Sequence, residues 1–174
     1  KIPADEQVGD GRAVARLSDI GWGTRLRELV GPGAADGPVP AAVVDAVVGV
    51  LRTWGWMERP VAVAAMPSRT RPELIASLAE RIATLGKLQL LGPLAYAHGG
   101  PTGAHGGNSA HRLAAVWERI VVPPDVAAAV APLIGPVLLV DDVADSRWTL
   151  TVAGRALRQA GVTAVLPLVL AIDG

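Results

Sequence analysis

The sequence predicts an α/β fold in which helices flank a central, mainly parallel sheet. The apolar run at residues 137–140 does not alternate with polar residues, which is typical of a strand covered on both faces. Asp141 and Asp142 follow it directly, at the strand end where open parallel sheets bind ligands. The order strand, turn, amphipathic helix occurs at residues 61–85 and again at 137–160, and such repeated units favour parallel strands.

The composition indicates one globular domain. Of the 174 residues, 51% are hydrophobic and the mean hydropathy is +0.38, which is enough for one substantial core. The 16 basic residues balance the 16 acidic ones, so any contact with DNA requires a local basic patch. The absence of cysteine excludes disulfides and Cys-based zinc sites from these residues.

Residues 1–40 are polar and rich in glycine and proline, and we interpret them as an N-terminal arm or linker ahead of a domain at residues 41–174. One short helix is expected in this arm, at residues 24–29. The arm also carries a basic group: Arg12, Arg16, Arg25 and Arg27. Two interpretations of this group stay open, a solvated surface of mixed charge and a contact with phosphate.

Beyond residue 40 the apolar spacing predicts the elements in order. A helix is expected over residues 41–54, and Pro72 can open the next helix at its first turn. Strands are expected at residues 61–66, 89–95, 118–122, 137–140 and 164–170. Pro167 cannot donate to a β-ladder, so we expect the last strand to be peripheral or irregular at that residue.

The Gly-rich segment at residues 98–108 is expected to be mobile, with Asn108 or Ser109 capping the helix that follows. A metal site is not expected, because ordered partner ligands are missing around the three histidines: His98, His105 and His111. No P-loop pattern occurs in the chain, so no ATP site of that class is expected within it.

The run from Pro136 to Thr149 resembles the phosphoribosyl-pyrophosphate loop of type I phosphoribosyltransferases, in which an apolar strand ends in two acids. The resemblance implies a fold of that type. It also implies that the acids hold ribose hydroxyls, while amides and hydroxyls of the next turn hold a 5′-phosphate at a helix N-terminus. The candidate ligand-binding loop is Asp141, Asp142, Val143, Ala144, Asp145, Ser146, Arg147, Trp148 and Thr149.

Three positions of this loop depart from the family pattern. Asp145 and Arg147 stand where a hydroxyl residue and a glycine are expected, and Trp148 stands where a small residue is usual. A side chain in place of the glycine obstructs the approach of the backbone to phosphate and penalises a positive φ. We therefore expect an altered site, and no catalytic residue is assigned.

Ser68, Arg69 and Arg71 follow the first strand expected after residue 40, where the resemblance places a loop that faces pyrophosphate. Two interpretations stay open. The arginines could bind a phosphate group through two parallel N–H donors, or they could form ion pairs with the acids of the ligand-binding loop and neutralise them.

Nearly the whole chain resembles the C-terminal region of actinobacterial-type RecQ-like ATP-dependent DNA helicases. The segments that carry this resemblance are Gly11-Arg12-Ala13, Leu17-Ser18-Asp19-Ile20-Gly21-Trp22-Gly23, Trp54-Gly55-Trp56-Met57-Glu58-Arg59-Pro60, Met66-Pro67-Ser68-Arg69-Thr70-Arg71-Pro72, Asn108-Ser109-Ala110-His111-Arg112-Leu113 and the loop from Asp141 to Thr149. They imply an accessory domain with a phosphoribosyltransferase-like fold behind a helicase motor and a zinc module. The first residue, Lys1, and the strand-like run near the last residue lead us to expect a segment of a longer polypeptide.

The resemblance also implies partners and cofactors. The expected partners are the motor and zinc modules of the same polypeptide, DNA, and a phosphate-containing small molecule. ATP, Mg and Zn are expected in those modules, with no cofactor in this segment, and the parent protein is expected to unwind DNA in the 3′ to 5′ direction during repair and recombination. A cytoplasmic location is expected, because residues 126–140 are interrupted by Pro132, Gly135 and Pro136, short of the roughly 20 apolar residues of a spanning helix. The resemblance to a DNA helicase further implies association with the nucleoid.

Two functions remain from this reasoning. One is the accessory helicase domain, in DNA engagement or regulation of unwinding, and the other is an active ComF-like phosphoribosyltransferase that uses phosphoribosyl pyrophosphate. A receiver-type signalling domain is excluded, because its acid pair follows the first strand, whereas Asp142 lies late in this chain. The altered turn after the acid pair favours the accessory role.

Overall fold

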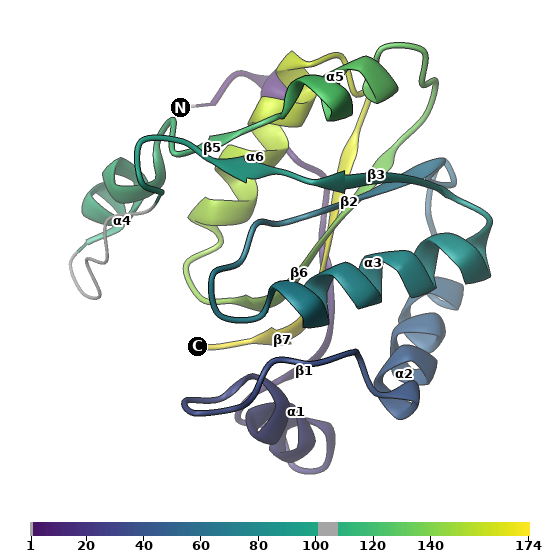
Figure 1. Cartoon of the computed structure of the whole chain (residues 1–174), viewed down its shortest axis with the longest axis vertical. Helices are drawn as coiled ribbons and strands as arrows, with labels where there is room; N and C mark the ends of the chain where they lie inside the picture. The colour runs from purple at the N-terminus through teal and green to yellow at the C-terminus, as the bar shows by residue number, and fades with distance from the viewer. Residues whose placement is uncertain (1, 101–107) are drawn as a thin grey trace.

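The computed structural model describes residues 2–100 and 108–174, and it confirms the predicted fold class. The central sheet has five strands in the order β1-β7-β6-β2-β3, and all of its strand pairs are parallel (Figure 1). Its strands are β1 (Arg12–Arg16), β2 (Ala62–Ala65), β3 (Gln89–Pro93), β6 (Val137–Ala144) and β7 (Val165–Ile172).

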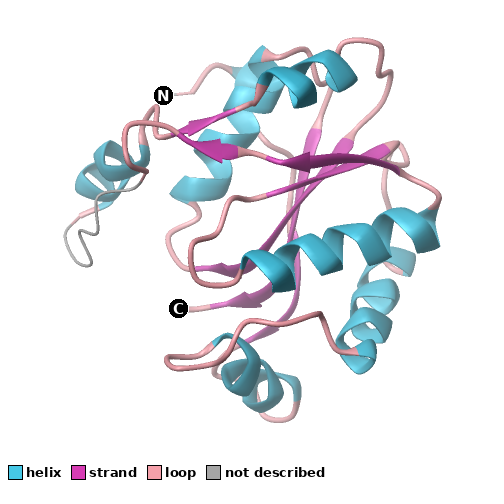
Figure 2. Ribbon diagram, viewed as in Figure 1, coloured by secondary structure: helices cyan, strands magenta, loops and turns pink. Residues whose placement is uncertain are grey.

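Helices cover both faces of this sheet (Figure 2). One face packs against α1 (Trp22–Val30), α2 (Ala41–Arg52) and α3 (Pro72–Gly86), and the other packs against α5 (Pro124–Val130) and α6 (Trp148–Gln159). The helix α4 (Ser109–Val116) and the short 3₁₀ turn η1 (Ala4–Glu6) complete the helical elements. Within the described residues, no helix has both the length and the apolar character that crossing a membrane requires.

The middle of β6 explains why its sequence is an unbroken apolar run. Leu138 and Val140 belong to the core on the α1, α2 and α3 side, whereas Val137 and Leu139 belong to the core on the α5 and α6 side. All four residues have 0% exposure. Because successive side chains of a strand point to opposite faces, a strand between two helical layers needs apolar residues at every position.

The strand β6 is longer than the sequence predicted. It continues through Asp141 and Asp142 to Ala144, and β7 pairs with it over this whole length, with Asp141 opposite Val169 and Ala144 opposite Ile172. The two acids therefore lie within the last half of the strand and not beyond its end.

The N-terminal segment contributes to the sheet. The prediction for residues 1–40 was an arm with one short helix, but Arg12–Arg16 forms the edge strand β1, parallel to β7, and α1 is longer than the helix expected there. Ala13 and Ala15 of β1 lie opposite Val169 and Ala171. A five-residue strand of this composition carries little periodic signal, and its partner lies more than 150 residues away in the sequence.

The position of β7 corrects a second prediction. Pro167 led us to expect a peripheral last strand, yet β7 lies between β1 and β6. Pro167 is opposite Leu139 of β6, and the ladder with β1 begins at the next residue, Leu168. Pairing with the edge strand thus starts only after the proline, which is how an interior strand tolerates it.

One of the expected strands is divided into two, and another lies outside the main sheet. The segment predicted at residues 89–95 forms β3 and then β4 (Ala95–Tyr96), and the one predicted at 118–122 forms the short β5 (Ile120–Val121). These two pair antiparallel in a separate two-stranded sheet. The ladder between β2 and β3 shifts register between Val63 and Ala64 of β2. On β3 this shift lies beside Gly92, which has a φ of 86°, so the edge strand is irregular there. The segment expected to be mobile lies mostly outside the described residues.

Candidate functional site at the carboxyl edge of the sheet

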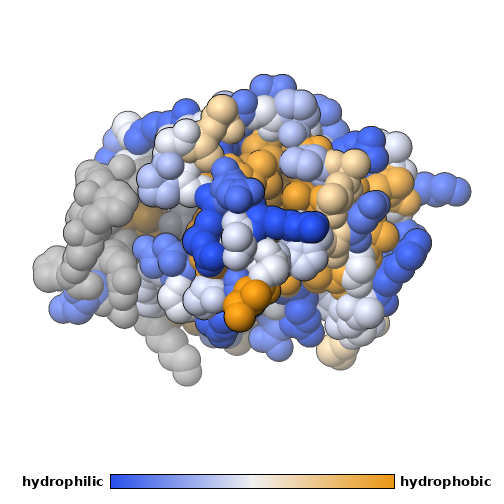
Figure 3. All heavy atoms as spheres, turned by 90° about the horizontal axis from the view of Figure 1, so that it is seen from below, coloured by the Kyte–Doolittle hydropathy of each residue, from blue (hydrophilic) through white to orange (hydrophobic). Residues whose placement is uncertain are grey.

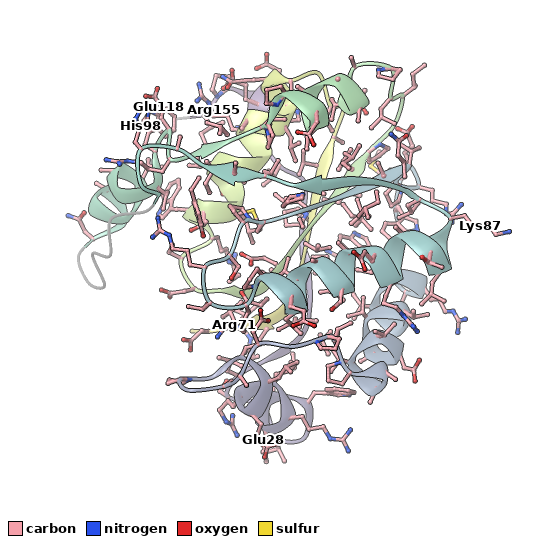
Figure 4. The ribbon with its side chains drawn as sticks, in the orientation of Figure 1. Glu28, Arg71, Lys87, His98, Glu118 and Arg155 are labelled. Atoms are coloured by element: carbon pink, nitrogen blue, oxygen red, sulfur yellow. The ribbon has the colours of Figure 1, made fainter. Side chains whose placement is uncertain are left out.

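The carboxyl ends of β2 and β6 bring together residues that are far apart in the sequence. Arg71, at the start of α3, places its Nε atom 2.5 Å from Oδ2 of Asp142 in an ion pair. Both side chains are mostly buried, with 18% and 11% exposure. Figure 4 labels Arg71 at the beginning of α3, on the side of the molecule where β7 ends. Of the two interpretations of the arginines, the structure supports pairing for Arg71.

Both carboxylate oxygens of Asp142 are engaged. While Oδ2 pairs with Arg71, Oδ1 accepts a hydrogen bond from the backbone N–H of Val143 at 2.7 Å. The neighbouring Asp141 accepts a bond from the backbone N–H of Asp142 at 2.9 Å. A ligand hydroxyl would therefore meet an acid pair that already accepts three hydrogen bonds from the protein.

The surroundings of Asp141 favour its protonated form. Burial raises the pKa of Asp141 well above its ordinary value of 3.8, and the charge of Asp142 raises it further. The backbone hydrogen bond and the charge of Arg71 act in the opposite direction on this pKa, without cancelling the rise.

The other residues of the loop after β2 are also engaged within the protein. Ser68 accepts a hydrogen bond at Oγ from the backbone N–H of Arg71 at 3.0 Å, which holds the turn into α3. The guanidinium of Arg69 lies 4.8 Å from the ring centre of Tyr96 and donates to the carbonyl of Gly99. Arg69 therefore contacts the β4 region, whereas Arg71 contacts the acid pair.

Tyr96 lies close to the same site. Its hydroxyl donates a hydrogen bond to the carbonyl of Pro67 at 2.8 Å. Burial raises the pKa of Tyr96, and the negative charge of Asp141 contributes to the rise. Sequence reasoning did not find Tyr96, because β4 comes near the loop after β2 only in the folded chain.

The amino end of α3 is capped by an aspartate that the sequence placed in the arm. Asp36 accepts hydrogen bonds from the backbone N–H groups of Glu73 at 2.9 Å and Leu74 at 3.0 Å. Burial opposes ionisation of this carboxyl, but those amides, that of Gly37 and the charge of Arg71 together lower the pKa of Asp36. An anion at this helix end would compete with the carboxylate of the protein itself.

In the loop after β6, Arg147 adopts a backbone conformation that glycine usually takes. Arg147 has a φ of 62° and a ψ of −14°, in the left-handed region, at the position before the first residue of α6. Its carbonyl accepts bonds from the N–H and the hydroxyl of Thr151, each at 3.0 Å. Among the described residues, the side chains of Asp145, Ser146 and Thr149 show no hydrogen bond to protein.

A cavity of about 640 Å³ lies beside this turn, between β1, β7 and α6. Ala13, Ala15 and Val169 line it from the sheet, and Leu150 and Thr151 line it from α6. Two arginines of the basic group, Arg12 and Arg16, line this cavity together with Arg147 of the candidate loop. The sequence treated these arginines as parts of two separate segments, and the parallel pairing of β1 with β7 is what brings them together.

Two of these arginines also have contacts within the protein. Arg16 donates to the carbonyl of Gly174 at 2.9 Å, and the guanidinium of Arg12 lies 5.4 Å from the ring centre of Trp54. Another arginine of the basic group, Arg25, does not line the cavity. It lies 5.2 Å from the ring centre of Trp22. Within the described residues no cluster of three or more His, Cys, Asp or Glu side chains could hold a metal ion.

Comparisons with known proteins do not add a family to this picture. No protein-family model matches the chain, and no curated protein matches it either.

Proposed function

We propose that this chain is an accessory domain of a RecQ-like ATP-dependent DNA helicase, with a phosphoribosyltransferase-like fold whose substrate site has been altered and which supports DNA engagement or regulates unwinding. The observation that carries the loss of catalysis is the ion pair between Arg71 and Asp142. The helicase link rests on the segments of sequence that resemble that family.

The ion pair matters because the acid pair is where this type of fold would hold ribose hydroxyls. A hydroxyl that approaches Asp142 meets one oxygen paired with Arg71 and another that accepts the Val143 amide. The guanidinium neutralises the charge of Asp142 and restricts the approach to its remaining lone pairs. Both effects weaken Asp142 as an acceptor for a ribose hydroxyl.

The phosphate loop supports the same conclusion. Arg147 retains the left-handed backbone, but its side chain occupies the place that a glycine would leave open to phosphate. An exposed guanidinium at that point suits a phosphate of a DNA backbone or of a small molecule bound from outside. Arg12 and Arg16 line the same cavity, and the three arginines outnumber the two acids in its lining, Asp10 and Asp19.

An active ComF-like phosphoribosyltransferase is the second candidate. It is favoured by the free side chains of Ser146 and Thr149 in the described loop and by the twelve-residue helix that begins directly after Arg147. Helix N-termini of this kind bind phosphate readily. The two candidates differ in whether the acid pair takes up a ribose.

Turnover assays separate the two candidates. The isolated domain is incubated with phosphoribosyl pyrophosphate, Mg²⁺ and a panel of acceptors, which are purines, pyrimidines and the precursors of these bases. The release of pyrophosphate is measured. We expect no release from the wild type. The phosphoribosyltransferase would be established instead if the wild type releases pyrophosphate and Asp142→Asn abolishes that release. The control is Asp125→Asn, an exposed change on α5, which should leave the release unchanged.

The helicase role is tested in the parent protein. Deletion of these 174 residues is expected to leave ATP hydrolysis largely intact, because no P-loop is removed, and to change duplex unwinding or DNA affinity. A deletion variant with unchanged unwinding and unchanged affinity would contradict the proposal.

A further inference from the structure

A second hollow lies at the opposite edge of the sheet, where β2, β3 and β6 begin. It has a volume of about 360 Å³ and lies between the last turns of α2 and α3. Its lining is mainly apolar and includes Leu51, Trp56, Ile82, Leu85, Leu88 and Leu138. We call it the amino-edge groove. The candidate site described above is at the other end of the strands, so the amino-edge groove has no part in it.

Apolar side chains at this groove remain open to solvent. Leu85 is 55% exposed although it lies on α3, and Met57, the neighbour of Trp56, is fully exposed. Trp56 is held in place by stacking on Trp54, with the ring centres 4.9 Å apart. In Figure 3, which looks from the α1 end, hydrophobic surface shows between charged side chains toward the side that carries α2 in Figure 1. Exposed apolar surface with a polar rim is characteristic of protein interaction sites.

The rim of the groove is positively charged. Arg52 and Arg59 line it, and Lys87 directly follows the lining residue Gly86. Within the described residues none of these three cations has a carboxylate within 4.0 Å, and Arg59 instead donates to the carbonyl of Gly86 at 2.6 Å. Figure 4 shows Lys87 projecting from the end of α3, away from the body of the molecule. Glu58 is the acidic residue next to Arg59 in the sequence, so the rim carries a net positive charge.

We propose that the amino-edge groove docks an acidic amphipathic peptide segment of a partner protein. Large apolar side chains of that segment fill the hollow above Leu138, and its carboxylates pair with Arg52, Arg59 and Lys87. Amphipathic segments are commonly bound in apolar grooves in this way, and charge complementarity at the rim sets specificity and association rate. This inference does not depend on the helicase proposal.

The chemistry of the groove favours a peptide over single-stranded DNA. DNA would need aromatic faces on which its bases stack. Trp56 is the aromatic residue in the lining, and Trp54 already covers one face of its ring. The floor is aliphatic, with Leu88 and Leu138, and it matches leucine or phenylalanine side chains better than base edges that require hydrogen bonds.

The test is a selection from a displayed library of random twelve-residue peptides on the full 174-residue chain. Each enriched peptide is then synthesised with a fluorescent label and titrated by anisotropy. We expect peptides that combine leucine, phenylalanine or tryptophan with aspartate or glutamate. Binding should weaken at least tenfold in Leu85→Glu and in Arg52→Glu. The matched control is Ile20→Glu, which changes an apolar residue that is 99% exposed at the other edge of the sheet.

A charge swap strengthens the test. A selected peptide whose acidic residues are replaced by lysine should bind wild type at least tenfold more weakly and regain affinity for Arg52→Glu. Melting curves confirm that each variant is folded. The proposal is overturned if no peptide is enriched above the Leu85→Glu background, if the enriched peptides are basic, or if their binding is the same in all variants. It is equally overturned if a labelled single-stranded oligonucleotide binds and loses affinity in Arg52→Glu, because the groove would then serve nucleic acid.

Discussion

At the scale of the residue, the acid pair shows how neighbours decide what a carboxyl group can do. Asp141 and Asp142 are chemically identical and adjacent, but Asp142 has a guanidinium partner and Asp141 has none at bonding distance among the described residues. Burial, with the nearby charge of Asp142, raises the pKa of Asp141, and this rise has a measurable consequence.

The raised pKa of Asp141 predicts a loss of stability as the pH rises. The folded state holds the proton of this group more tightly than the unfolded chain does. The stabilisation is therefore fully present below the ordinary value of 3.8 and is lost as the pH rises through the raised pKa of Asp141. Urea unfolding of wild type and Asp141→Asn at a series of pH values measures this difference. A difference between the two proteins that does not change with pH would contradict the prediction.

Arg147 supports a second prediction at this scale. Its left-handed backbone costs a non-glycine residue about 1–2 kcal/mol, and glycine avoids this cost. Arg147→Gly should therefore raise the free energy of unfolding by about 1 kcal/mol, whereas Arg147→Ala should not, because alanine has the same backbone restriction. Equilibrium denaturation of both variants checks this. Equal stability of the glycine and alanine variants would show that the turn is not strained.

At the scale of the element, the N-terminal segment is held against α6 by close packing at one glycine. A Cβ atom added at Gly154 would lie 2.0 Å from Cγ1 of Val8 and 3.5 Å from Cγ1 of Val165. Glu6 extends the same contact through its 2.5 Å ion pair with Arg155 of α6. The path of the chain ahead of β1 thus depends on a small residue in the middle of a helix.

This contact reverses the usual effect of a substitution in a helix. Gly154→Ala would ordinarily stabilise a helix by about 1 kcal/mol. Here the clash with Val8 should make the change destabilising by about 1–3 kcal/mol. Val8→Ala combined with Gly154→Ala should recover much of this loss, and the double-mutant cycle gives the coupling. Additive effects of the two changes would mean that the two residues do not constrain each other.

At the scale of the whole molecule, the sheet separates two surfaces of different character. The acid pair lies at the carboxyl edge, the cavity lined by arginines runs beside β1 along the side of the sheet, and the amino edge has the apolar groove with its basic rim. A phosphate-bearing ligand and a protein segment would therefore meet different surfaces of the domain.

The arginine-lined cavity predicts how DNA binding depends on salt. If Arg16 and Arg147 contact DNA phosphates, replacing either by glutamine should weaken binding almost regardless of sequence and reduce the salt slope by about 0.7 to 0.9 per contact. Arg81→Gln, an exposed change on α3, is the matched control. Fluorescence anisotropy over a range of salt concentrations measures the slope. Identical slopes for all four proteins would place any DNA contact elsewhere.

The sequence by itself determined the fold class and the composition of the candidate loop. The unbroken apolar run of β6 predicted a strand covered on both faces, and the repeated strand-turn-helix order predicted parallel pairing, because both features depend on local periodicity. The glycine position taken by Arg147 could also be recognised, because a loop pattern is local.

Only the tertiary structure decided which partners meet at the site. Arg71 was one of two equivalent arginines until folding placed it, and not Arg69, against Asp142. Asp36 belongs to the segment that we interpreted as an arm, and it caps α3 because the chain passes that helix end on its way to α2. The edge strand β1 has too short a pattern to be predicted, and it forms because β7 presents an open edge to it. Contacts between residues distant in the sequence depend on the packing of whole elements, and no local pattern of residue types encodes that packing.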